Sequence, residues 1–217
     1  MKADIKFCGL TRPADAELAA ELGAAYTGVI FAGGPRNLTL DRAVEVFSNV
    51  PSTVSRVGVF ADQAPEEIAR IADRCQLGVV QLHAAFSPER IESLRREFDG
   101  QVWSVCRVSG GSLPDDVPSM VDASDGILLD ALVPGQLGGT GVTIPWAQLS
   151  TEVRRVQGRR TVILAGGLRP ENVAEAIGAL GPDVVDVSSG VESAPGIKDP
   201  ARMRAFRDAV NQISSLP

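Results

Sequence analysis

The sequence predicts an α/β protein, a single (β/α)8 TIM barrel that spans residues 1–217, and two observations support this fold class. Eight short apolar, β-branched runs alternate with segments whose apolar residues recur at helical spacing, which is typical of parallel strands joined by helices. The residues after the first run, Cys8-Gly9-Leu10-Thr11, lack the G-x-G-x-x-G turn that would favour an open doubly wound sheet. Eight units within about 200 residues therefore favour a closed barrel of compact size.

Each expected strand is a short run rich in apolar and β-branched residues, as buried parallel strands usually are. In chain order the runs are Ile5–Cys8, Tyr26–Phe31, Val54–Phe60, Gly78–His83, Val102–Val108, Gly126–Asp130, Thr161–Ala165 and Val184–Val187.

Helices are expected between these strands, and several of them should open with proline, which the first helical turn tolerates. Behind Pro65, the apolar residues Ile68, Ile71 and Ala72 recur at helical spacing. Similar openings are Pro88-Glu89, Pro170-Glu171 and Pro200-Ala201.

The loop between the sixth and seventh expected strands is longer than the others. It runs from Ala131 to Gly141 and is rich in glycine. A long loop at the catalytic face of a barrel is usually functional, as a lid or a phosphate cradle. An insertion without a role is the alternative.

The composition is that of a soluble globular protein, with 44% apolar and 22% charged residues and a net charge of −6. The negative charge argues against nucleic-acid and anionic-membrane partners, and neither a membrane-spanning run nor a signal peptide is recognisable. Cys8, Cys75 and Cys106 are too few and too scattered for a disulfide framework or a metal site. A reduced, cytoplasmic compartment is expected.

Side chains at the carboxyl ends of barrel strands point into the active site, so the polar residues there are informative. Cys8 ends the first strand on the same face as Lys6, and both a catalytic role and a small buried residue are open for it. Asp130 closes an apolar run, where an unpaired carboxylate is costly to bury, so a functional role is expected. Arg36 lies in the glycine-rich loop after the second strand, and Asp186 lies in the eighth strand.

The remaining candidates carry weaker signals. His83 is the only histidine and fits either a core position or a pocket wall. Cys75 and Cys106 look structural. With one histidine and no metal cluster recognisable in the sequence, the expected chemistry is acid/base catalysis without a cofactor or a metal.

Two glycine groups follow consecutive strands, Gly166-Gly167 after the seventh and Ser189-Gly190 after the eighth. Glycine lets backbone N–H groups approach an anion closely, neighbouring helix N-termini add positive charge, and barrels often bind phosphate at these two loops. The pairing predicts a phosphate site, and two ordinary tight turns are the alternative.

Several motifs together resemble those of the phosphoribosylanthranilate isomerases. The opening Lys6-Phe7-Cys8-Gly9-Leu10-Thr11 is similar to that family's K-I-C-G-L-T. The other matching blocks follow in the family's order: Val57–Phe60, Val80–His83, Leu128–Asp130, Gly138–Gly141, Ala165–Leu168, Asp186–Glu192 and Pro195–Asp199.

The resemblance implies an Amadori rearrangement of N-(5′-phosphoribosyl)anthranilate, a small phosphorylated aminosugar, in tryptophan synthesis. It implies Asp130 as general acid and Cys8 as general base, with Arg36 at the anthranilate carboxylate. Lys6 and Asp186 are further substrate-binding candidates, and Lys6 and Arg36 are the nearby cations that would favour a thiolate. The enzyme is expected to be a monomer or a homodimer.

The chain departs from the family pattern at Ala84, where glycine is usual, at Pro145, where aspartate is usual, and at Phe7. The first two put local loop conformation in doubt. The nearest rival interpretation is the related isomerase of histidine synthesis, which has aspartate where this chain has Cys8, or a bifunctional form that serves both pathways. The others are indole-glycerol-phosphate synthase, which relies on lysines, and a non-catalytic barrel that binds a sugar phosphate.

Overall fold

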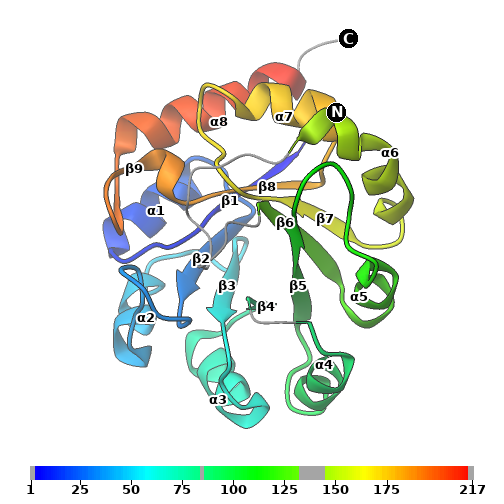
Figure 1. Cartoon of the computed structure of the whole chain (residues 1–217). Coiled ribbons are helices and arrows are strands. Elements are labelled where there is room, and N and C mark those ends of the chain that lie inside the picture. Colours follow the sequence, from blue (N-terminus) through cyan, green and yellow to red (C-terminus); the bar gives the residue numbers. More distant parts are fainter. Residues whose placement is uncertain (1–2, 84–85, 132–144, 215–217) are drawn as a thin grey trace.

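The computed structural model describes residues 3–83, 86–131 and 145–214, and these form a closed eight-stranded parallel barrel (Figure 1). The strands follow one another around the barrel in chain order, and β8 pairs with β1 to close it. The strands are β1 Asp4–Phe7, β2 Tyr26–Ile30, β3 Ser55–Phe60, β4 Val79–Leu82, β5 Gln101–Val108, β6 Gly126–Ala131, β7 Thr161–Leu164 and β8 Val184–Val187. The predicted fold class is thus confirmed.

The helices form an outer ring around the barrel, as the view along its axis shows (Figure 1). They are α1 Pro13–Glu21, α2 Leu40–Val46, α3 Pro65–Cys75, α4 Pro88–Arg95, α5 Val117–Ala123, α6 Trp146–Val156, α7 Val173–Leu180 and α8 Pro200–Ser214. None of the helices in the described residues is long and apolar enough to cross a membrane.

Three of the four expected proline openings are confirmed, at Pro65, Pro88 and Pro200. The fourth is wrong, because α7 begins at Val173 and Pro170 lies in a turn before it. The side chain of Asn172 explains the difference. Its Oδ1 accepts from the backbone N–H of Arg169, and its Nδ2 donates to the carbonyl of Gly167, so local hydrogen bonds hold a turn where a helix was expected.

The barrel interior is filled by a layer of apolar side chains below the carboxyl ends of the strands. Trp103 is fully buried, and its ring meets that of Tyr26 edge-on at a centroid distance of 4.9 Å. Gly126 leaves room for the indole, since a Cβ there would lie 2.6 Å from Trp103 Cδ1. The other members of this interior layer are Val57, Val79, Val105, Leu128, Ile163, Ala165 and Val184. This part of the interior is therefore solid, and the polar side chains of the barrel lie above it, toward the carboxyl ends of the strands.

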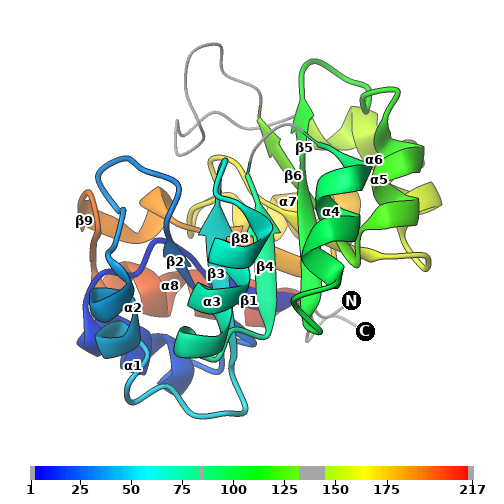
Figure 2. The same ribbon diagram turned by 90° about the horizontal axis from the view of Figure 1, so that it is seen from below.

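A short hairpin follows β8 and lies outside the ring of strands. A turn of 3₁₀ helix, η1 Ser189–Val191, leads into β9 Glu192–Ala194, which pairs antiparallel with β10 Ile197–Lys198. In the side view the strand arrows run toward the end of the barrel where the β2–α2 connection and the β9 segment lie (Figure 2). The hairpin thus belongs to the catalytic face of the barrel.

Candidate active site

A cavity of about 360 Å³ opens at the carboxyl ends of the strands, which is a volume suited to a small ligand. Its lining includes these residues named from the sequence: Cys8, Arg36, His83, Asp130, Gly166, Gly167, Asp186, Ser188, Ser189 and Gly190. Topology explains their convergence. Cys8 and His83 each lie one residue beyond the end of a strand, and all strands end at the same rim.

Cys8 is held at the floor of this cavity by the backbone. Its N–H donates to the carbonyl of Val187 at 2.9 Å, which extends the β1–β8 pairing by one residue. Gly28 on β2 makes room for the thiol, since a Cβ there would lie 3.2 Å from Sγ. Burial raises the pKa of Cys8, and so does the charge of Asp186, while Lys6 and Lys198 act in the opposite direction without outweighing burial. The substrate-free site therefore favours the thiol.

Lys6 lies beneath the cavity, where its side chain is fully buried. Its ammonium donates to Gln81 Oε1 and to Asp186 Oδ2, both at 2.8 Å. Burial alone would lower the pKa of Lys6, but the negative charges of Asp186 and Cys8 raise it. Lys6 is not among the residues that line the cavity, so the structure places it behind Cys8 and Asp186 rather than against a bound molecule.

Asp186 lines the cavity and is paired through one of its two carboxylate oxygens. Its Oδ2 is bonded to Lys6, whereas Oδ1 is buried and accepts no hydrogen bond from the described residues. The hydroxyl of Ser188 is likewise buried and makes no hydrogen bond within that part of the chain. Buried polar atoms are almost always bonded, so two of them at one cavity are available for polar groups of a ligand.

Asp130 lies near the end of β6, three strands around the ring from β1, and is buried at the cavity wall. Arg107 of β5 lies beside it in register, with Nη1 3.3 Å from Asp130 Oδ2. Cys8 and Asp130 therefore reach one cavity from separate strands, an arrangement that can transfer protons at two different atoms of one ligand. Arg107 was not predicted from the sequence as a site residue, although it is a polar residue near the carboxyl end of a strand, the kind of position that indicated the other candidates.

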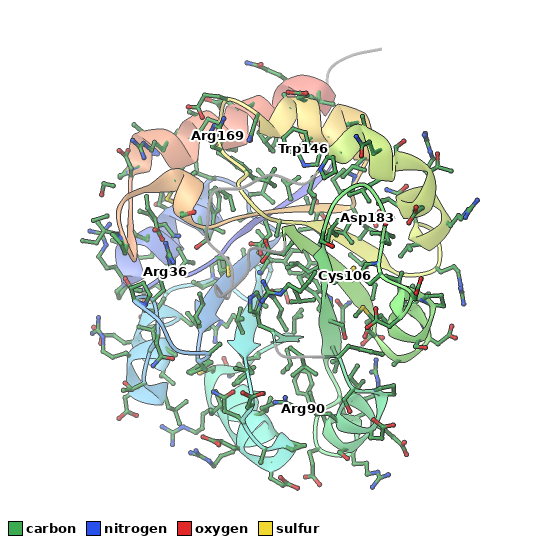
Figure 3. All side chains as sticks on the ribbon, viewed as in Figure 1. Arg36, Arg90, Cys106, Trp146, Arg169 and Asp183 are labelled. Carbon is green, nitrogen blue, oxygen red and sulfur yellow. The ribbon has the colours of Figure 1, made fainter. Side chains whose placement is uncertain are left out.

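Arg36 reaches the cavity from the loop after β2, on the side of the barrel where β9 also lies (Figures 1 and 3). Its Nε and Nη2 donate to the two carboxylate oxygens of Glu192 at 2.8 and 2.7 Å. Glu192 lies in a block that resembles the family, but nothing in the sequence indicated this contact.

The glycine turns after β7 and β8 lie side by side, as the sequence predicts. Gly166 and Gly167 have φ values of 80° and 65°, a region that favours glycine. Gly190 packs against the backbone of the other turn, since a Cβ there would lie 1.9 Å from the carbonyl oxygen of Leu168. Within the described residues, the N–H groups of residues 166, 167, 189 and 190 donate to no protein acceptor. This is the arrangement that an anion requires.

The other residues named from the sequence have a simpler placement. Cys75 and Cys106 are buried without a disulfide, and burial raises their pKa values to about 11 and about 12. Pro145 directly precedes α6. Ala84 and the glycine-rich loop from residue 132 onward lie outside the described residues. Among the residues that the structure describes, no cluster of His, Cys, Asp and Glu could hold a metal ion.

Comparisons with known proteins agree with this geometry. Residues 5–209 match the family described as N-(5′-phosphoribosyl)anthranilate (PRA) isomerase. Proteins named N-(5′-phosphoribosyl)anthranilate isomerase from Paramagnetospirillum magneticum and Chromohalobacter salexigens are 40% and 42% identical; the matches cover 95% and 97% of this chain and 96% and 95% of theirs.

Solved structures of the same enzyme have the same fold. The Thermus thermophilus structure has a TM-score of 0.83 at 35% identity, and the Thermotoga maritima structure has one of 0.85 at 32%. Each comparison covers 97% of this chain and 99% of the solved one. A third structure, 31% identical with a TM-score of 0.82, holds reduced 1-(o-carboxyphenylamino)-1-deoxyribulose 5-phosphate and has the same coverage. The chain therefore belongs to the phosphoribosylanthranilate isomerase family.

Proposed function

We propose that this chain converts N-(5′-phosphoribosyl)anthranilate into 1-(2-carboxyphenylamino)-1-deoxyribulose 5-phosphate, an Amadori rearrangement in tryptophan biosynthesis, by acid/base catalysis without a cofactor. One observation carries the assignment of residues: a single cavity joins Cys8, Asp130 and Arg36 to the glycine turns after β7 and β8. The substrate has matching groups, namely a sugar that must exchange protons, an aryl carboxylate and a phosphate.

The two ends of the substrate would be held by opposite sides of the cavity. The unengaged N–H groups of Gly166, Gly167, Ser189 and Gly190 would bind the phosphate. Arg36 would bind the anthranilate carboxylate through a charge-assisted hydrogen bond. Asp186 would accept a hydrogen bond from the sugar at its buried Oδ1. Lys6, one layer below, would hold Asp186 in place rather than touch the substrate.

The first chemical step would be acid catalysis by Asp130. Its carboxylic acid would protonate the furanose ring oxygen as the bond from that oxygen to carbon 1 breaks. The electron pair of that bond leaves with the oxygen, and the nitrogen lone pair forms a C=N bond to carbon 1. The result is an open-chain protonated imine, with Asp130 left as the carboxylate.

The second step would be base catalysis by Cys8. Its thiolate would remove the proton from carbon 2, and the C–H electron pair would form a C=C bond while the imine electrons return to nitrogen. The enolamine then tautomerises to the ketone. Although burial raises the pKa of Cys8, the positive charge of the imine would favour the thiolate at the moment when a base is needed.

We further propose that residues 1–217 form one catalytic unit that works in the cytoplasm, as a monomer or a homodimer. A relative from Thermotoga maritima, 32% identical, is described as a dimeric enzyme from which monomers were generated. Sedimentation of the purified protein would distinguish the two states.

A turnover assay tests the function directly. Purified protein is mixed with freshly formed N-(5′-phosphoribosyl)anthranilate, and the loss of the adduct's fluorescence is followed. We expect enzyme-dependent loss with the aminodeoxyribulose phosphate as product. Binding without turnover would favour a sugar-phosphate-binding protein, and turnover only of the aminated ribose phosphate of histidine synthesis would favour the related isomerase.

A further inference from the structure

A buried ion cluster lies behind Arg36 on the β9–β10 hairpin. Glu192 of β9 accepts from Arg36 on both of its oxygens, and its Oε1 also accepts from Lys198 Nζ of β10 at 2.8 Å. Lys198 and Glu192 pair across the hairpin, and their side chains are 0% and 6% exposed. A carboxylate and an ammonium are costly to bury, so the presence of these buried charges requires an explanation.

The pairing leaves one edge of the guanidinium open. Glu192 occupies the edge formed by Nε and Nη2, while Nη1 of Arg36 donates to no acceptor in the described part of the chain. A guanidinium carries five N–H donors in a planar fork and can bind a second carboxylate on its other edge. The contact with Glu192 thus fixes the plane of the fork and the direction in which the open edge points.

Gly9 contributes to the same placement. The aliphatic part of Arg36 lies across it, since a Cβ at Gly9 would lie 2.6 Å from Arg36 Cδ. Gly9 directly follows Cys8, so the guanidinium is anchored beside the proposed base as well as beside the hairpin.

The charges of the cluster sum to one positive charge. A guanidinium paired with Glu192 alone would be neutral, and the glutamate would repel an incoming carboxylate. Lys198 offsets that charge. Burial raises the pKa of Glu192, but Arg36 and Lys198 lower it further, so the carboxylate stays ionised. Burial lowers the pKa of Lys198 below its ordinary value, and Glu192 opposes this shift without cancelling it.

We propose that Glu192 and Lys198 are positioning residues: Glu192 orients Arg36 toward the aryl carboxylate of the substrate, and Lys198 keeps the cluster positive, so that the pair sets the preference for an o-carboxyphenyl over a phenyl group. The inference rests on the proposed function. It assigns no proton transfer to either residue, since neither lines the cavity.

The affinities of two ligands distinguish this role from a general effect on folding. One is reduced 1-(o-carboxyphenylamino)-1-deoxyribulose 5-phosphate, and the other is the same compound with an unsubstituted phenyl ring. Calorimetry gives the ratio of their Kd values for the wild type and for E192Q, which keeps the shape of the side chain and removes its charge. We expect E192Q to bind the carboxylated ligand about tenfold more weakly, because Arg36 is then no longer held in the orientation that meets the carboxylate, and to bind the phenyl ligand unchanged.

A double-mutant cycle tests whether Glu192 acts through Arg36. R36A should remove most of the preference for the carboxylated ligand, and adding E192Q to R36A should then change it no further. R202A is the matched control, because Arg202 Nη1 donates to the backbone carbonyl of Glu192 and not to its side chain. R202A should leave the ratio of Kd values at the wild-type value.

K198M provides a second route should E192Q fail to fold. Without the ammonium the Arg36–Glu192 pair is neutral, so the carboxylated ligand should bind several-fold more weakly while the phenyl ligand keeps its affinity. Equal weakening of both ligands in E192Q and K198M would reduce the cluster to a structural role and overturn the inference. Tighter binding of the carboxylated ligand by E192Q would also overturn it, because Glu192 would then compete with the substrate. Turnover by the wild type tests the proposed function separately.

Discussion

The thiol of Cys8 experiences opposing influences from its surroundings. Burial raises its pKa most, Lys6 and Lys198 lower it, and Asp186 raises it, with a net increase over the ordinary thiol value. The sequence predicted Lys6 and Arg36 as the cations that favour a thiolate. Lys6 does lower the pKa of Cys8, but the second cation with this effect is Lys198, and together they do not exceed the effect of burial. The proposed mechanism therefore depends on charge that the substrate brings.

This balance predicts a distinctive pH dependence. The base is active when deprotonated, and its pKa in the substrate-free protein is raised, so kcat/KM should increase with pH through neutrality and beyond the ordinary thiol pKa of about 8.5. The corresponding increase of kcat with pH should occur at lower pH, because the protonated imine favours the thiolate in the complex. Rates measured across the pH range in which the protein is stable give the pH profiles of both kcat/KM and kcat. A plateau of kcat/KM already below pH 7 would contradict the prediction.

The catalytic pair gives the second prediction. D130N and C8A should each lower kcat by orders of magnitude while the fold is retained, since acid and base act on the transition state. C8S should keep at most a trace, because a hydroxyl is a far weaker base than a thiolate. C106A is the control, since Cys106 lies in the core and outside the cavity. Near-normal turnover by C8A would require another base, and His83 would be examined next.

At the scale of elements, the connection after each strand decides what the cavity contains. The turns after β7 and β8 supply backbone N–H groups, and the loop after β2 supplies Arg36. The hairpin after η1 supplies Glu192 and Lys198, which hold Arg36 without lining the cavity. The strands contribute Asp130 and Asp186 to the cavity lining and apolar packing below it. Most of the binding chemistry is thus carried by connections on a rigid scaffold, which is how barrels usually carry function.

The phosphate turn gives the third prediction. G167V places a side chain where φ is 65° and where the proposed phosphate would lie, so KM should rise at least about tenfold with a smaller change in kcat. Inhibition by inorganic phosphate should weaken in parallel. G158V is the matched control, because Gly158 also has a positive φ, of 82°, but lies before β7 at the opposite end of the barrel with open space around it.

G158V bears a comparable backbone strain, of about 1–3 kcal/mol, without touching the site. Its KM should equal that of the wild type even if its melting temperature falls. Equal KM values in the two variants would show that the turn after β7 does not bind the phosphate of the substrate.

At the scale of the whole molecule, stability depends on joining the two ends of the chain. β1 pairs with β8 over four residues, and α8 packs on β1, where the rings of Phe7 and Phe206 meet at 6.1 Å. The turns that follow β1 and β8 belong to the cavity, so the same closure also assembles the site.

Removing the Phe206 ring tests this closure. Phe206 is fully buried, so F206A should lower the free energy of unfolding by about 3–5 kcal/mol. R204A, on the exposed face of the same helix, should stay within about 0.5 kcal/mol of the wild type. Urea unfolding followed by circular dichroism measures both. A loss below 1 kcal/mol in F206A would show that α8 contributes little to closure.

The sequence by itself determined the fold and most members of the site. Strand periodicity is local, and in a parallel barrel every strand ends at the same rim, so Cys8, Asp130, Asp186 and the glycine turns had to converge. Their roles in catalysis and binding stay proposals, which the variants above test.

Only the tertiary structure decided which side chains pair. Arg36 and Glu192 are 156 positions apart, and Lys6 and Asp186 are 180 apart, so no local pattern relates them. The tertiary structure also places Lys6 below the cavity, because its ammonium reaches Asp186 and Gln81 across the barrel interior. Residue type and spacing fix which face a residue occupies, whereas ion pairs depend on side-chain conformations set by packing from all sides.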